Sequence, residues 1–260
     1  FGGIAPEPSS KNLEKVRKVL DESKSWFRLG AIFDPDGDRI RFYDGTREID
    51  MNQFGAIAFH YMATWRKEQG CVAKSVATSN FVNIIAEKLG VPVMETPVGF
   101  KNFRPWLSRN AKQKALVAFE ESDGISGLNN TLEKDAQFGL LIALEILATT
   151  GKNLGEYLDA LYEEYGRFYP TRSGFEVDKS LVGEPLKAKV NAIADIAKPG
   201  AKVMVGANEK TVKQLLTLDG VKVIFDDDSW MLVRPSGTEP KVRIYTECRS
   251  EERRGGEGCR

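Results

Sequence analysis

Three aspartates at alternate positions are the most chemically suggestive group in the sequence. Asp34, Asp36 and Asp38 stand in the stretch AIFDPDGDRIRFYDG, and Arg39 follows directly. Alternate residues of an extended loop point the same way, so the three carboxylates can converge. At about 5 Å and an effective dielectric of about 20, each pair of carboxylates repels by roughly 3 kcal/mol. A convergent trio therefore predicts a bound cation, and hard oxygen ligands suit Mg²⁺ or Ca²⁺.

Two other interpretations of these aspartates are weighed against a magnesium site. The calcium-binding EF-hand loop needs Gly at its sixth position and Glu at its twelfth. Counted from Asp34, these positions hold Arg39 and Gly45, so the EF-hand pattern fails. A solvated Asp/Gly turn with splayed carboxylates needs no metal, and it stays open at this point.

A second group of polar residues lies between two apolar runs in MLVRPSGTEPKVRIY. A guanidinium, two hydroxyls and a glycine-centred run of backbone N–H groups can surround a phosphate. The residues are Arg234, Ser236, Gly237 and Thr238. Pro-Ser-Gly would also form a plain hairpin turn. Because a turn requires neither the arginine nor the threonine, the pattern favours a phosphate site.

Two weaker groups follow expected strands. Glu120 and Ser122 lie in AFEESDGISG, and Gly99 and Lys101 lie in VGFKNF. Carboxylates at a strand end can accept hydrogen bonds from sugar hydroxyls, although an acidic surface loop explains the first group equally well. The only histidine, His60, falls in a helical pattern and is interpreted as structural.

The hydrophobic pattern predicts elements that could position these groups. A short apolar strand at 29–33 leads into the aspartates, and a strand at 40–45 returns. Asn130 and Glu133 suggest a capping box at the start of a long helix. Alternation of strands and helices predicts an α/β domain with a mixed, mainly parallel sheet, followed after about residue 172 by a small α+β unit. The other expected helices span 9–20, about 50–67 and 80–90, and the other expected strands include 70–79 and 113–122.

Composition excludes several broad classes of function. The 260 residues include 37 basic and 37 acidic side chains, so a general nucleic-acid or membrane surface is not expected. The longest apolar run falls short of the roughly 18 residues of a membrane span. Three cysteines without CxxC spacing favour neither structural zinc nor a disulfide framework, so we expect a cytoplasmic protein.

Taken in order, the four polar groups resemble those of the α-D-phosphohexomutase superfamily, which contains phosphoglucomutase and phosphomannomutase. The resemblance covers about residues 1–250. It implies that Asp34, Asp36 and Asp38 bind Mg²⁺ and that Arg39 lies near the reacting phosphate. It further implies that the sugar is contacted by Gly99, Lys101, Glu120 and Ser122. The second phosphate would be bound by Arg234, Ser236, Gly237 and Thr238.

The resemblance also implies an activity. Members of this family interconvert hexose 1-phosphates and hexose 6-phosphates through a phosphoserine and a hexose 1,6-bisphosphate, which acts as an activator. The family's Ser-His-Asn-Pro loop does not occur in this sequence, so we expect the chain to be a C-terminal piece that is inactive without the N-terminal domains. Asp123 also replaces a glycine that many members carry, which affects the sugar loop.

The expected domains are 1–69, the end of a second domain with the metal loop, 70–172, a sugar-binding third domain, and 173–250, a phosphate-binding fourth domain. Residues 251–260 are expected to form a disordered tail. The expected partners are a hexose phosphate and the missing N-terminal domains. A non-catalytic module that binds sugar phosphate or metal, and a calcium-binding structural protein, are the alternative hypotheses.

Overall fold

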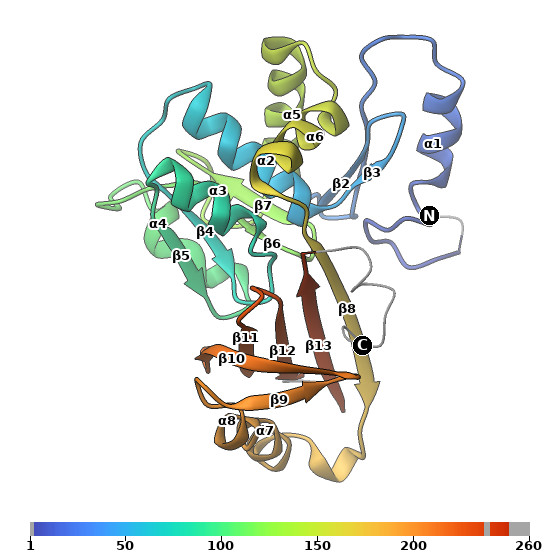
Figure 1. The fold of residues 1–260 in the computed structure, drawn as a ribbon. Helices are drawn as coiled ribbons and strands as arrows, with labels where there is room; N and C mark the ends of the chain where they lie inside the picture. Colours follow the sequence, from blue (N-terminus) through green and yellow to red (C-terminus); the bar gives the residue numbers. More distant parts are fainter. Residues whose placement is uncertain (1–2, 237–239, 250–260) are drawn as a thin grey trace. The chain divides into compact units, whose positions relative to one another are not determined.

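The computed structural model describes residues 3–236 and 240–249, which divide into two compact units. Unit 1 comprises Phe1–Gly166 and unit 2 comprises Arg167–Arg260. Each unit has its own sheet framework (Figure 1). Within the described residues, no helix is both long enough and apolar enough to cross a bilayer.

The larger sheet of unit 1 has the strand order β5-β4-β6-β7. β4 pairs in parallel with β5 and β6, whereas β7 runs antiparallel to β6. Every residue of β4 and β6 is buried, as expected for central strands covered on both faces. The predicted mixed, mainly parallel sheet is therefore confirmed. Its strands are β4 (Cys71–Ser75), β5 (Val93–Thr96), β6 (Ala115–Glu120) and β7 (Gly124–Gly127).

A second, antiparallel sheet of unit 1 carries the aspartate loop. It consists of β1 (Gly30–Phe33), β2 (Ile40–Tyr43) and β3 (Glu48–Ile49) in that order. The α/β pattern suggested that the strand before the aspartates belongs to the parallel sheet. It belongs instead to this antiparallel sheet, where β1 pairs with β2. The two sheets are linked by an isolated bridge between Arg39 and Gly124.

Two helices of unit 1 begin or end at signals in the sequence, whereas the helix expected at 9–20 begins only at Glu14. Asp50 and Gln53 form a capping box at the start of α2, and Gly90 ends α3 with a φ of 66°. The cap predicted for α5 is wrong, because Asp135 rather than Asn130 accepts the first N–H groups of that helix. The helices are α1 (Glu14–Asp21), α2 (Met51–Thr64), α3 (Phe81–Leu89), η1 (Phe100–Phe103), α4 (Arg104–Leu107), α5 (Ala136–Thr150) and α6 (Leu154–Tyr165).

Unit 2 is the predicted small α+β unit. Its sheet is antiparallel with the order β8-β13-β12-β11-β10-β9, and α7 packs against β12. Val190, Val221 and Val223 belong to its apolar core. Its elements are β8 (Tyr169–Glu176), η2 (Lys179–Leu181), α7 (Glu184–Asn191), α8 (Ile193–Ile196), β9 (Lys202–Val205), β10 (Asn208–Leu216), β11 (Val221–Phe225), β12 (Trp230–Pro235) and β13 (Lys241–Cys248).

Candidate functional site

The aspartate loop connects β1 to β2 and is closed by its own first carboxylate. Asp34 Oδ1 accepts hydrogen bonds from the backbone N–H groups of Asp38 and Arg39, both at 3.0 Å. Gly37 takes a φ of +69°, which suits glycine, and its N–H donates to the Asp34 carbonyl at 3.1 Å. The loop therefore has a defined shape that the Asp-x-x-Gly spacing makes possible.

The three carboxylates of this loop converge. One oxygen from each of Asp34, Asp36 and Asp38 lies within 4.8 Å of the others. Burial raises the pKa of Asp34 above its ordinary value, and the neighbouring Asp38 and Asp36 carboxylates act in the same direction. The splayed arrangement that would need no cation is not the one the chain adopts.

The donor set of this loop fits a hard divalent cation. Asp38 Oδ1 is shielded from solvent and accepts no hydrogen bond from the described part of the chain. A shielded carboxylate oxygen without a hydrogen bond is costly unless a cation comes close to it, and the Arg39 Nε lies 3.7 Å away. Asp34 and Asp38 are half-buried and Asp36 is exposed, so three oxygens could hold Mg²⁺ with water completing its octahedron.

Two basic side chains flank the trio, and only one of them was predicted. Arg39 Nε lies 3.6 Å from Asp34 Oδ2 and 3.7 Å from Asp38 Oδ1. Lys134 Nζ, from the segment before α5, lies 2.6 Å from Asp38 Oδ2. The sequence held no spacing signal for this contact, because Lys134 is almost one hundred residues away. Both cations offset part of the charge of the loop.

The predicted sugar loops are joined by a hydrogen bond. Glu120, buried at the end of β6, accepts the N–H of Gly99 at 2.7 Å. Gly99 has a φ of 123°, a backbone conformation that residues other than glycine rarely adopt. Lys101 is exposed and Ser122 is half-buried, and neither side chain pairs with another described residue. One oxygen of Glu120 is therefore used inside the protein.

Asp123 ties the sugar loop to the strand that follows the aspartates. Its carboxylate makes a bidentate pair with Arg41, with distances of 3.1 Å to Nε and 2.7 Å to Nη2. Its carbonyl accepts the N–H of Ile40 at 2.9 Å. Asp123 itself has a φ of 71°, which aspartate tolerates better than most residues. Asp123 therefore has a structural role, because it joins the loop after β6 to β2.

The predicted phosphate motif lies in unit 2 between β12 and β13. Arg234 Nε donates to Asp219 at 2.7 Å, and the buried Ser236 donates its N–H to the Lys241 carbonyl at 2.8 Å. The predicted Gly237 and Thr238 lie outside the described residues. The pairing of Arg234 with Asp219 was not expected from the sequence.

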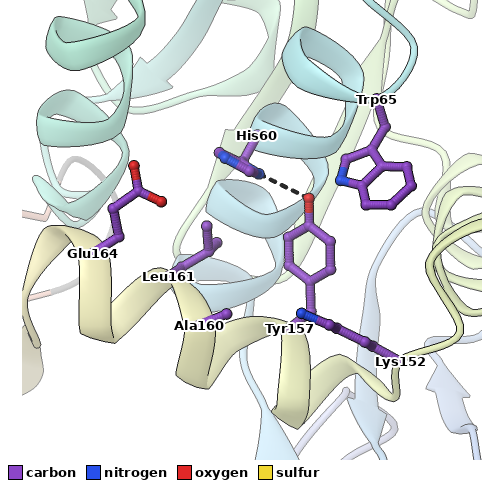
Figure 2. A pocket seen from close by; sticks show the side chains of 7 residues that line it. All are labelled: His60, Trp65, Lys152, Tyr157, Ala160, Leu161 and Glu164. Atoms are coloured by element: carbon purple, nitrogen blue, oxygen red, sulfur yellow. Dashed lines mark hydrogen bonds between the residues drawn. The ribbon is translucent and has the colours of Figure 1, made fainter.

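His60 takes part in packing between α2 and α6. Its Nδ1 lies 2.8 Å from the hydroxyl of Tyr157, and burial lowers the pKa of the imidazole (Figure 2). The two residues line a pocket of about 110 Å³ together with Trp65 and Glu164. None of the residues predicted to bind metal or substrate lines this pocket.

Two family models match the chain. The model described as "Phosphoglucomutase/phosphomannomutase, alpha/beta/alpha domain III" matches residues 50–165. The model described as "Phosphoglucomutase/phosphomannomutase, C-terminal domain" matches residues 180–255.

Individual relatives agree with these matches. A phosphoglucomutase/phosphomannomutase of Thermococcus kodakarensis is 32% identical over 97% of this chain and 50% of its own length. A crystal structure of a family protein from Burkholderia thailandensis has a TM-score of 0.72 at 20% identity, covering 95% of this chain and 48% of that one. Aspergillus fumigatus N-acetylphosphoglucosamine mutase, in complex with GlcNAc-6P and magnesium, has a TM-score of 0.56 at 18% identity, covering 89% and 51%. The latter two likenesses show the fold alone, and the chain spans about half the length of the relatives it matches.

Proposed function

Because the chain belongs to the phosphoglucomutase/phosphomannomutase family, we propose that it forms the metal- and sugar-phosphate-binding part of an enzyme that interconverts hexose 1-phosphates and hexose 6-phosphates. The observation that carries the proposal is the convergence of Asp34, Asp36 and Asp38 within 4.8 Å. Arg39 and Lys134 offset part of this charge, and a bound divalent cation would offset the rest.

The proposed metal ligands are these three carboxylates. A bound Mg²⁺ would offset the charge of the phosphoryl group in transfer, which is the main demand of this chemistry. Arg39 is the proposed catalytic residue, because its guanidinium flanks the trio and can hold the reacting phosphate. Lys134 would help to keep the Asp38 carboxylate in place.

The sugar and the second phosphate are assigned to the other groups. Glu120, Ser122 and the Gly99–Lys101 loop would orient the ring by accepting from and donating to its hydroxyls. The hydrogen bond from Gly99 to Glu120 supports this assignment, since it holds both loops in one arrangement. In unit 2, Arg234 and Ser236, with Gly237 and Thr238, would hold the phosphate that does not react.

The phosphoryl group would be carried by a phosphoserine that this sequence lacks, with a hexose 1,6-bisphosphate as the intermediate. We therefore propose that turnover requires the N-terminal half of the family fold. The division into 1–69, 70–172 and 173–250 is kept as a proposal, as is the cytoplasmic location.

Metal binding is tested directly by titrating the chain with Mn²⁺ and recording free Mn²⁺ by electron paramagnetic resonance. We expect one site that Mg²⁺ displaces, weakened about tenfold or more in Asp36→Asn because one anionic ligand is lost. Asp195→Asn, which removes an exposed carboxylate in unit 2, is the matched control and should bind as the unaltered chain does. Equal affinities of all three proteins would refute the metal assignment.

The activity is tested by a coupled assay with glucose 1-phosphate, Mg²⁺ and glucose 1,6-bisphosphate. The chain alone should give no turnover, and the full reading frame that contains it should be active. Robust turnover by the chain alone would overturn the requirement for a separate phosphoserine. Metal binding without turnover of any hexose phosphate by the full reading frame would support the non-catalytic module instead.

A further inference from the structure

A second pocket of unit 1 contains none of the residues assigned above. It measures about 290 Å³ and lies between the segment before β1, the turn from β2 to β3, and the first turn of α6. Sites for small molecules begin at about this size. Its lining is polar apart from one tryptophan, Trp26.

The walls of this pocket are held by hydrogen bonds between distant parts of the chain. The side chain of Asn153 accepts the N–H of Arg28 at 2.9 Å and donates to the carbonyl of Trp26 at 2.8 Å. The buried Asp44 accepts the N–H of Gly155 at 2.7 Å. The pocket is thus preformed, which lowers the entropy cost of ordering a ligand.

The charged side chains of the pocket differ in whether they have hydrogen-bonding or ion-pair partners. Asp44 accepts several backbone and hydroxyl donors, and Arg47 makes a bidentate pair with Asp159 at 2.8 and 2.6 Å. Arg28 differs, because its guanidinium has no acceptor within the described ranges and its Nε is shielded from solvent. Lys24 is exposed and likewise forms no ion pair with any described residue. Two unpaired cations therefore face the same space.

The position of Arg28 is fixed by the turn beneath it. A Cβ added to Gly45 would lie 2.6 Å from Arg28 Nε, so the guanidinium lies directly over the glycine. Arg28 is half-buried, and its Nε is the guanidinium nitrogen that is both shielded and without an acceptor. A shielded N–H without an acceptor is costly, and the planar fork of a guanidinium suits the oxygens of a phosphate. An anion that reaches Arg28 would remove this cost.

The remaining lining indicates what the anion is attached to. Trp26 is 70% exposed and offers an apolar ring face. Glu156 Oε2 accepts the N–H of Asn153 at 2.7 Å, while Oε1 has no partner in the described structure and can accept from a hydroxyl. We propose that this pocket binds a small sugar phosphate, with the phosphate on Arg28 and Lys24 and the ring against Trp26. This second site does not depend on the proposed mutase activity.

The test uses the whole chain in EDTA, so that no metal site contributes, and follows tryptophan fluorescence during titration with glucose 6-phosphate. We expect a saturable change that disappears in Trp26→Phe. Arg28→Met should weaken binding about tenfold or more, because a bidentate charged contact is lost. Arg109→Met, which removes an exposed arginine without a described partner, should leave the affinity unchanged.

Several results would overturn the proposal. An Arg28→Met affinity within about twofold of the unaltered chain would exclude the guanidinium as the anchor. A fluorescence change that persists in Trp26→Phe would place binding elsewhere, including at the proposed mutase site. Glucose or inorganic phosphate binding as tightly as glucose 6-phosphate would refute recognition of the combined ligand. Arg28→Lys, which keeps the charge, serves if Arg28→Met fails to fold and should weaken binding less.

Discussion

Replacing Asp123 with asparagine should remove a pH-dependent loss of stability from unit 1. Burial raises the pKa of this carboxyl from its ordinary 3.8 to about 6. Arg41 opposes the rise, but its guanidinium also pairs with Glu48 at 2.9 Å, so a single cation serves two acids. Asparagine keeps the shape of the protonated acid and tolerates the positive φ of this position.

The sign follows from proton binding. Below the unfolded pKa of 3.8, both states hold the proton and Asp123 contributes nothing. Between that value and about 6, the unfolded chain loses its proton while the folded chain keeps it, so stability falls as the pH rises. A shift of about two pKa units corresponds to about 3 kcal/mol in total, of which about 2 kcal/mol falls between pH 4 and pH 7.

The measurement is urea unfolding of both proteins at pH 4 and pH 7, with the Asp123 carboxyl followed directly by NMR. The free energy of unfolding of Asp123→Asn, minus that of the unaltered chain, should grow by about 2 kcal/mol over this range. Glu87→Gln, which removes an exposed acid from α3, is the control and should show no such growth.

The reasoning would be refuted by an NMR transition of Asp123 at or below its ordinary value. That result would mean that Arg41 outweighs burial at this position. A difference in stability that shrinks as the pH rises would lead to the same conclusion.

Three further substitutions test packing and capping. Gly55→Ala should destabilise the chain by about 1–3 kcal/mol, despite the better helix propensity of alanine, because the new Cβ would overlap the Phe119 ring. Unfolding in urea measures this, and a gain in stability would contradict the close approach of α2 to β6. Asp135→Ala should cost about 1 kcal/mol through loss of the α5 cap. Asn130→Ala should cost less, because the Asn130 side chain donates to Asp135 and Ser126 but does not itself cap the helix. Thermal unfolding of the two variants measures both losses of stability. A larger loss in Asn130→Ala than in Asp135→Ala would contradict the assignment of Asp135 as the cap.

Local signals explain what could be predicted from the sequence. The three carboxylates converge through a local turn rather than through extended alternation, because the Gly37 N–H donates to the Asp34 carbonyl and Gly37 takes a positive φ. Asp50 and Gly90 likewise marked helix ends through local signals. Asn130 misled because Asn-x-x-Glu is a common pattern, and the choice between Asn130 and Asp135 depends on where α5 meets β7.

The contacts that complete the site are distant in sequence and have no local pattern. Lys134 reaches Asp38 only because α5 packs against β7 and brings its preceding segment to the aspartate loop. Arg41 and Asp123 are 82 positions apart, and no local sequence pattern around either residue predicts their pairing. The pairing of Arg234 with Asp219 likewise follows from the antiparallel register of unit 2.

The bridge between Arg39 and Gly124 makes one continuous backbone framework out of two chemically different loops. Under the proposed assignment, a substitution that reshapes the Glu120 side for another sugar would also shift the oxygens on the aspartate side. The proposed function therefore implies that sugar preference and ion affinity are coupled, and that variants of this chain changing one property without the other should be rare.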